Sequence, residues 1–318
     1  MTPWASAMPG GRTLSVDLVA VVVAVTGGEP RVLTTAHGLA LPAGPFEQGH
    51  RTLQAGLRAW VEQRTHHPLG YVEQLYTFAD RDRVDPRREA SQVMSISYLA
   101  LTREANSTAG DQAEWRPWYH YFPWEDWRSG APAVLEDTIE PGLRCWVGEV
   151  TGEARWLREQ RVNLTFGLGD SGWNEDLVLQ RYELLFEAGL VAEAGRQADA
   201  EAAGARPDST AMAHDYRRIL ATGMARLRAK IKYRPVVFEL MPPEFTLLQL
   251  QQTVEALAGR SLHKQNFRRL IEQQELVEET GRVMAGAAGR PAKLFRFRRG
   301  VMLERAIAGS KLPLARML

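Results

Sequence analysis

The sequence predicts an α+β protein in which a first domain built around a buried strand is followed by a winged helix-turn-helix domain. Two patterns carry this prediction. The apolar run Ser15–Val25 is rich in β-branched residues, as expected of a strand buried on both faces. Residues 241–299 have, in order, the patterns of a helix, a short turn, a second helix and a two-stranded ribbon with a glycine-rich tip.

The formal charge is unevenly distributed along the chain. Residues 213–318 contain 20 Lys/Arg against 9 Asp/Glu, which gives +11, and because the whole chain carries +1, residues 1–212 carry −10. A basic third joined to an acidic two-thirds is typical of a nucleic-acid-binding domain attached to a domain of another kind. A chance cluster of solvated basic residues is the alternative.

The cysteine content and the apolar runs indicate in which cellular compartment the protein is expected. Cys145 is the single cysteine, so no internal disulfide can form and a reducing compartment is favoured. The sequence has no CxxC motif or His/Cys cluster, so no metal site is predicted, and no Ser-His-Asp or Cys-His arrangement indicates a catalytic residue. Val16–Val25 is too short to cross a bilayer. We therefore expect a cytoplasmic protein without a membrane partner.

The domain boundaries are predicted from composition. We expect a first domain over residues 13–190 with a Trp-rich insertion at about 103–170, a linker over 191–213 and a second domain over 214–318. In the first domain, strands are predicted at Arg31–Thr35, Tyr71–Phe78 and Met94–Leu101, and helices at Arg51–Arg64 and Ser171–Leu190. The last helix, capped by Asn174, is expected to cover the sheet. The four tryptophans of Trp115–Trp127 are open to several interpretations: a lid, a dimer surface, an extra subdomain or core packing.

The second domain begins with a basic amphipathic helix, His214–Tyr233, which is expected to link the domains and either to pack or to contact DNA. A short strand is predicted at Pro235–Leu240. The helix Leu247–Ala258 has an N-cap candidate in Thr246 and ends at Gly259, and Ser261 is expected to cap the next helix, Leu262–Gln274.

The helix Leu262–Gln274 has the composition of a recognition helix. Arg, Lys, Asn and Gln are the side chains that contact base edges in the major groove. The predicted DNA-binding residues are His263, Lys264, Gln265, Asn266, Arg268 and Arg269 on this helix and Arg290 and Lys293 on the wing, where phosphates are expected. Double-stranded DNA is thus the predicted partner, and a solvated basic face is the alternative.

The first domain resembles the Nudix fold, which implies an α/β/α sandwich with a mixed sheet. Gly44 and Gly49 fit the loop of the Nudix box, Arg58 fits its arginine and Glu62 one of its glutamates, whereas other positions depart from the box: His50, Ala59, Gln63 and Thr65. Hydrolysis in this fold uses Mg²⁺, which prefers several oxygen ligands in octahedral geometry. Because one expected glutamate remains, the resemblance implies a nucleotide pocket without efficient hydrolysis. Mg²⁺ is expected only if some hydrolase activity persists.

The chemistry of a nucleoside diphosphate suggests which residues would line this pocket. Arginines suit the pyrophosphate, and aromatic faces suit the adenine. The candidates are Arg58, Glu62, Tyr76, Phe78, Arg81 and Arg83. The alternatives are a helix ion pair for Arg58 and Glu62, core packing for the two aromatic residues and a solvated loop for the last two arginines.

The C-terminal block resembles one family more closely. The segments MPPEFTLLQLQ, LAGRSLHKQNFRR, LVEETG and GRPAKLFRF are similar to the pattern of Nudix-related transcriptional regulators of NAD metabolism. The resemblance implies a homodimeric repressor that senses ADP-ribose or a related NAD metabolite and requires no other cofactor. Two alternatives remain open: a Nudix hydrolase acting on ADP-ribose or NADH with an ancillary basic domain, and a nucleic-acid-binding adaptor whose Nudix fold is a scaffold.

Overall fold

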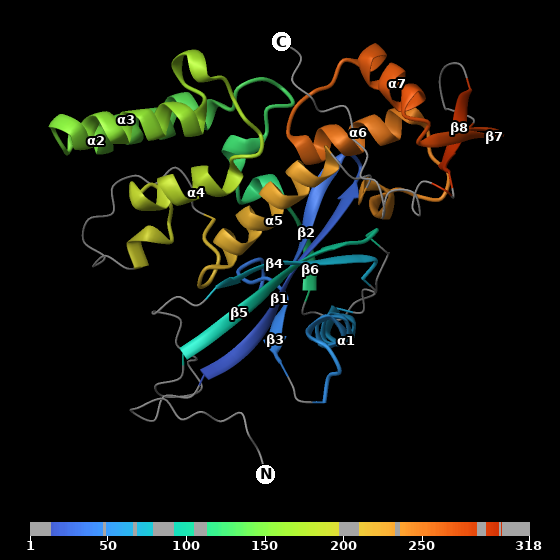
Figure 1. The fold of residues 1–318 in the computed structure, drawn as a ribbon, viewed down its shortest axis with the longest axis horizontal. Helices are drawn as coiled ribbons and strands as arrows, with labels where there is room; N and C mark the ends of the chain where they lie inside the picture. The colour runs from blue at the N-terminus through green and yellow to red at the C-terminus, as the bar shows by residue number, and fades with distance from the viewer. Residues whose placement is uncertain are drawn as a thin grey trace.

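Six strands form a mixed sheet at the centre of the first part of the chain (Figure 1). The computed structural model describes residues 14–46, 49–65, 69–78, 92–104, 113–196, 210–232, 236–284, 291–298 and 300. The strands are β1 (Leu14–Thr26), β2 (Glu29–Thr35), β3 (Ala43–Pro45), β4 (Tyr71–Phe78), β5 (Gln92–Leu101) and β6 (Ala113–Pro117). Their order is β4-β5-β1-β2-β6, with β3 also paired to β1; β1 and β5 run parallel, and the other pairs are antiparallel.

Strand β1 is buried on both faces, as its continuous apolar run predicts. Leu18, Ala20 and Val22 belong to the core beneath helix α1 (Leu53–Thr65), which also contains Leu57 and Val61. The residues between them, Val19, Val21 and Val23, belong to the larger core on the opposite face. Successive side chains of a strand point to opposite faces, so this one strand contributes to both cores.

Helix α5 (Tyr216–Ile231) covers the second face of the sheet. A Cβ on Gly223 would lie 2.8 Å from Val21, so the helix backbone approaches β1 closely. The expectation that the helix at residues 171–190 covers the sheet is wrong, because α4 (Val178–Glu187) packs on α5 instead. The packing alternative for the basic helix is thus confirmed, and α5 is the second helix layer of the sandwich rather than a connector between domains.

Between β6 and α5, the chain forms a helical layer beside α5 (Figure 1). Its elements are η1 (Trp118–His120), η2 (Pro123–Glu125), η3 (Leu135–Ile139), α2 (Glu140–Gly148), α3 (Gly152–Phe166), η4 (Gly169–Ser171), α4 and η5 (Ala194–Arg196). Trp118 and Trp124 are fully buried in the larger core, which confirms the core-packing interpretation for these two. Asn174 accepts a hydrogen bond from the Asp176 amide at 3.1 Å, but α4 begins only at Val178, with Leu177 at its N-cap position.

The winged helix comprises η7 (Val236–Leu240), α6 (Leu247–Ala258), α7 (Lys264–Gln273), β7 (Val277–Met284) and β8 (Ala292–Phe297). The predictions for α6 are confirmed, since Thr246 and Gln249 form a capping box and Gly259 ends the helix at φ 71°. The strand predicted at residues 235–240 is wrong. Val236, Val237 and Leu240 are buried on one side of a 3-10 helix instead. Backbone hydrogen bonds between Phe245 and Phe295 join the start of α6 to the wing.

Helix α7 begins two residues later than predicted, with His263 rather than Ser261 at the N-cap. The Ser261 hydroxyl instead donates a hydrogen bond to the Arg128 carbonyl oxygen at 2.8 Å.

Among the residues that the structure describes, no helix combines the length and the apolar character that a membrane crossing requires.

Candidate nucleic-acid interface

Helix α7 presents a polar and basic face to solvent. Phe267 and Ile271, four residues apart, are buried against α6 and fix the orientation of the helix. Five of the six DNA-binding residues predicted on this helix are exposed: His263, Lys264, Gln265, Arg268 and Arg269. Asn266 is half-buried. The structure therefore brings the predicted residues of this helix together on one element, with the apolar pair on the side that faces the protein.

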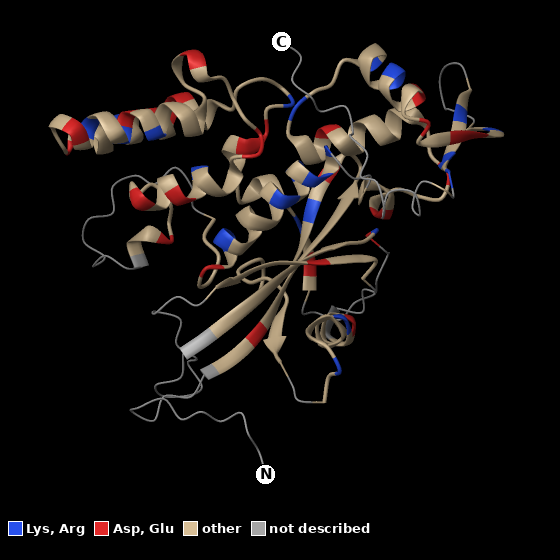
Figure 2. Cartoon of the chain, viewed as in Figure 1, with Lys and Arg blue, Asp and Glu red and all other residues tan. Residues whose placement is uncertain are grey.

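The basic residues of α7 and of the wing differ in their pairing. Within the described residues, Lys264, Arg268 and Arg269 form no ion pair. The wing alternates acidic and basic side chains (Figure 2). Its pairs join Arg282 to Glu244, Lys293 to Glu279, Arg296 to Glu278 and Arg298 to Glu275, all at 2.7–2.8 Å. The uncompensated positive charge therefore lies on the helix, and Arg290 lies outside the described residues.

The arginine of the Nudix-like box has a structural role. The Arg58 guanidinium donates hydrogen bonds to the carbonyl oxygens of Leu69 and Gly70, the latter at 2.7 Å, and so holds these two residues, which precede β4, against α1. It forms no ion pair with Glu62, which is exposed. Gly44 packs closely against Trp60, because a Cβ there would lie 2.0 Å from the Trp60 ring.

The remaining pocket candidates lie apart. Tyr76 is 55% exposed, whereas Phe78 is buried and its ring lies 5.6 Å from the Arg218 guanidinium carbon. Arg81 and Arg83 lie outside the described residues. Within the part of the chain that the structure describes, no group of three or more His, Cys, Asp or Glu side chains is arranged to hold a metal ion. Ala59 and Gln63 stand where a hydrolytic box has carboxylates, so the described residues of the box do not fit a catalytic Mg²⁺ cluster.

The sequence analysis did not predict a buried ion-pair network that lies next to the end of α6. Glu125 is fully buried and receives hydrogen bonds from Arg181 at 2.5 and 2.9 Å and from Arg228 at 2.5 Å. Burial disfavours the carboxylate, but the two guanidinium groups outweigh it and hold the pKa of Glu125 below its ordinary value. The sequence contained one indication that Arg228 is buried. It follows the buried Met224 by four residues, and this spacing places the arginine on the apolar stripe of α5.

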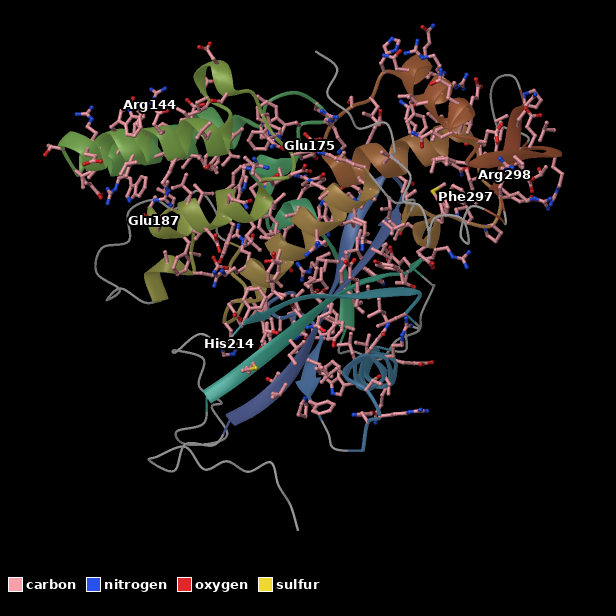
Figure 3. All side chains as sticks on the ribbon, viewed as in Figure 1. Arg144, Glu175, Glu187, His214, Phe297 and Arg298 are labelled. Carbon is pink, nitrogen blue, oxygen red and sulfur yellow. The ribbon has the colours of Figure 1, made fainter. Side chains whose placement is uncertain are left out.

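A second set of ion pairs lies where α5 meets the winged helix. Glu175 is buried and lies 2.9 Å from Lys232, which follows α5, and 3.6 Å from Arg260 in the turn between α6 and α7 (Figure 3). Burial opposes ionisation of Glu175, but the Lys232 hydrogen bond and the Arg260 charge lower its pKa. The turn of the helix-turn-helix is thus tied electrostatically to the sandwich.

Taken together, the topology and the exposed helix define a two-part protein: a Nudix-like sandwich without a metal cluster among its described residues, joined to a winged helix. Residues 237–297 match the family described as the NrtR DNA-binding winged helix domain, so the chain carries that domain at its C-terminal end. The prediction of a DNA-binding winged helix is confirmed.

A curated relative is similar over part of the chain. The chain is 41% identical over 86 residues to the ADPR responsive transcriptional repressor NtrR of Acinetobacter baylyi. The match covers 27% of this chain and 34% of that protein, so it spans about a third of the relative's length.

Solved structures share the fold over most of the chain. Shewanella oneidensis NrtR complexed with a 27mer DNA has a TM-score of 0.52 and 16% identity, covering 90% of this chain and 94% of that chain. A MutT/nudix family protein from Enterococcus faecalis has a TM-score of 0.50 and 16% identity, covering 92% and 89%. These likenesses confirm the predicted fold class, a Nudix-like sandwich followed by a winged helix.

Proposed function

We propose that this chain is a transcriptional repressor of NAD metabolism whose Nudix-like sandwich binds ADP-ribose or a related NAD-derived nucleotide and thereby controls DNA binding. The observation that carries the proposal is the basic face of α7, whose Lys264, Arg268 and Arg269 form no ion pair in the described part of the chain. Such side chains can exchange water and counterions for phosphates and base edges without first losing a protein partner. The match of residues 237–297 to a DNA-binding winged helix family supports the same conclusion.

The effector is proposed from the relative and from the box chemistry. The Acinetobacter baylyi protein with 41% identity over 86 residues is described as ADPR responsive. Ala59 and Gln63 replace carboxylates that hold the metal in a hydrolytic Nudix box, which favours ligand binding over hydrolysis. ADP-ribose regulates DNA binding only if it has different affinities for the DNA-bound and free arrangements.

The proposed assembly is a cytoplasmic homodimer on double-stranded DNA. Helix-turn-helix proteins commonly bind two half-sites related by a two-fold axis, and a dimer places two reading helices in successive major grooves. No metal or other cofactor is required for this activity.

The decisive experiment uses the full chain and a duplex selected by it from a random-sequence library. Binding to the selected duplex is measured by fluorescence anisotropy without ligand, with ADP-ribose and with NAD, over a series of salt concentrations. We expect steeply salt-dependent binding that ADP-ribose weakens. Binding that no nucleotide alters would instead support an adaptor with a scaffold-like Nudix fold.

The hydrolase alternative is tested in parallel. The full chain is incubated with Mg²⁺ and either ADP-ribose or NADH, and the products are separated by chromatography. Turnover that disappears in Glu62→Gln would replace the repressor proposal with the hydrolase. We expect no Glu62-dependent turnover, because Glu62 is the one carboxylate that remains among the expected metal ligands.

A further inference from the structure

The C-terminal end of α6 is capped by groups from outside the winged helix. The Tyr119 hydroxyl donates a hydrogen bond to the Ala256 carbonyl oxygen at 2.6 Å, and Arg228 Nε donates one to the Leu257 carbonyl oxygen at 3.0 Å. The last carbonyls of a helix have no partner within the helix, and a cation there complements the helix dipole. The Trp-rich segment and α5 therefore satisfy α6 where it would otherwise need water.

The turn that follows α6 is bound to the same segment through its backbone. The Trp127 amide donates to the Gly259 carbonyl oxygen at 2.7 Å, and Trp127 and Arg260 form a parallel bridge. The Ser261 hydroxyl adds the bond to the Arg128 carbonyl oxygen. We call Tyr119 and residues 125–128 the clamp. The approach is close, because a Cβ on Gly259 would lie 2.3 Å from the carbonyl oxygen of Glu125.

Helix α7 is joined to α6 and to this turn. The Glu255 carboxylate accepts a hydrogen bond from the Leu262 amide at 2.7 Å and another from Gln251 Nε2 at 2.9 Å. Gln251 Nε2 also donates to the Leu262 carbonyl oxygen at 3.0 Å. With Phe267 buried in the same core, the position of α7 follows the position of α6 and the turn.

The clamp is also anchored in the sandwich. Its Glu125 carboxylate is held by Arg228 of α5 and Arg181 of α4, and α5 lies directly on the sheet. Arg228 takes part in both attachments, since it binds Glu125 through Nη1 and the end of α6 through Nε. A contiguous set of hydrogen bonds thus leads from the helix layer over the sheet to the turn of the helix-turn-helix, which is the kind of connection that can carry coupling between sites.

We propose that the clamp positions α7 for DNA and that Tyr119 is a positioning residue through which the nucleotide state of the sandwich reaches α7. This inference rests on the proposed function for its ligand and its DNA. It assigns the Trp-rich segment a role beyond core packing. Because the segment binds both α5 and the turn before α7, it transmits a ligand-dependent change in the sandwich to α7.

The test compares two tyrosines that each donate a 2.6 Å hydrogen bond to a backbone carbonyl oxygen. Tyr119→Phe removes the bond to Ala256 and, with it, a longer bond of 3.4 Å that the Tyr119 hydroxyl accepts from Arg228 Nη2. Tyr121→Phe removes the bond to the Gly38 carbonyl oxygen within the sandwich. We expect Tyr119→Phe to weaken binding to the selected duplex about three- to tenfold, the usual range for one hydrogen bond. The factor by which ADP-ribose alters DNA affinity should fall as well, while the Kd for ADP-ribose alone stays unchanged. Tyr121→Phe should leave the affinity for DNA and the response to ADP-ribose unchanged.

The outcomes separate this inference from the proposed function. If the wild-type chain responds to ADP-ribose and Tyr119→Phe behaves like Tyr121→Phe, the clamp does not position α7. If Tyr119→Phe does not fold, Ser261→Ala replaces it, since Ser261 is exposed and its bond to Arg128 belongs to the same attachment. If the wild-type chain binds neither duplex nor ADP-ribose, hydrogen exchange still decides: α7 amides should lose protection in Tyr119→Phe and keep it in Tyr121→Phe, and equal protection overturns the inference.

Discussion

The Lys293 ammonium on the wing lies 2.8 and 3.0 Å from the two carboxylate oxygens of Glu279 on the opposite strand. Both side chains are more than half exposed, so the pair contributes little to stability and is screened by salt. Its importance lies in DNA binding, because a phosphate must compete with Glu279 for the lysine and is repelled by the carboxylate. On α7, Arg268 has no such competitor among the described residues.

Removal of the competing carboxylate should strengthen DNA binding. Glu279→Gln keeps the size of the side chain and leaves Lys293 free to meet a phosphate, so we expect about two- to fivefold tighter binding at low salt. The steepness of the salt dependence should increase. Fluorescence anisotropy with the selected duplex provides both quantities.

The control for this variant is Glu187→Gln. Glu187 forms a comparable exposed pair with Arg161 at 2.5 Å, but on α4, away from α7 and the wing (Figure 3). It should leave DNA affinity unchanged. An equal gain in both variants would indicate a general effect of net charge rather than release of Lys293.

Replacement of an arginine on α7 that forms no ion pair among the described residues should have the opposite effect. Arg268→Ala is expected to cost about 1–3 kcal/mol of binding free energy if the side chain contacts a base edge, and to relax sequence preference at that position. Lys264→Ala, if the lysine contacts a phosphate, should weaken binding to all duplexes alike. Arg144→Ala serves as the control, since Arg144 is an exposed arginine on α2 (Figure 3). Loss of affinity equal to that of Arg144→Ala would remove Arg268 from the interface.

The close approach of Gly44 to Trp60 predicts a stability effect. Gly44→Ala would place a methyl group 2.0 Å from the indole ring, so the ring or strand β3 must move, at a cost of about 1–3 kcal/mol of unfolding free energy. Gly49→Ala is the matched control, because no atom lies within 4 Å of a Cβ at that position. Urea denaturation should separate the two variants, and equal midpoints would show that Trp60 adjusts without cost.

The ion pair between Glu73 and Lys230 should make stability depend on pH. Burial disfavours the Glu73 carboxylate, but hydrogen bonds from Lys230 and Tyr71 outweigh this effect and lower its pKa below 4.5. Because the pKa is lower in the folded protein, the stabilisation is present above pH 4.5 and is lost as pH falls through the folded value. Glu73→Gln should therefore be less stable than wild type at neutral pH.

The difference between wild type and Glu73→Gln should shrink as the pH is lowered below 4.5, as measured by urea denaturation at successive pH values. Glu159→Gln on α3 provides the comparison, since Glu159 is exposed and forms no ion pair within the described residues. A difference from wild type that persists unchanged in acid would show that the Lys230 contact stabilises through packing rather than charge.

Local patterns in the sequence were sufficient to predict an element where its own residues determine where it begins and ends. Thr246 and Gly259 bracket α6 correctly because a capping hydroxyl and a left-handed glycine act within a few residues. Strand β1 was recognised because burial on both faces demands a continuous apolar run. The same reasoning failed for residues 236–240, where a short β-branched run is compatible with either a strand or a turn of helix.

The candidate site was predictable only in its exposed half. The basic face of α7 follows from helical spacing, whereas the buried partners of Arg181 and Arg228 lie 56 and 103 residues away in sequence, at Glu125. A charged residue on an apolar stripe is stable in the core only with such a partner, and a single sequence does not identify the partner. The position of α5 on the sheet could not be fixed for the same reason, since the sequence left packing and DNA contact both open for this helix.

The caps that Tyr119 and Arg228 provide for α6 affect how the winged helix could be transferred to another protein. A fragment containing residues 237–297 alone would leave the carbonyl oxygens of Ala256 and Leu257 to solvent and would expose the underside of the turn at Gly259. The winged helix is therefore joined to the rest of the protein by shared hydrogen bonds. A chimaera that exchanges DNA specificity should keep residues 119–128 and α5 from the same parent as the winged helix.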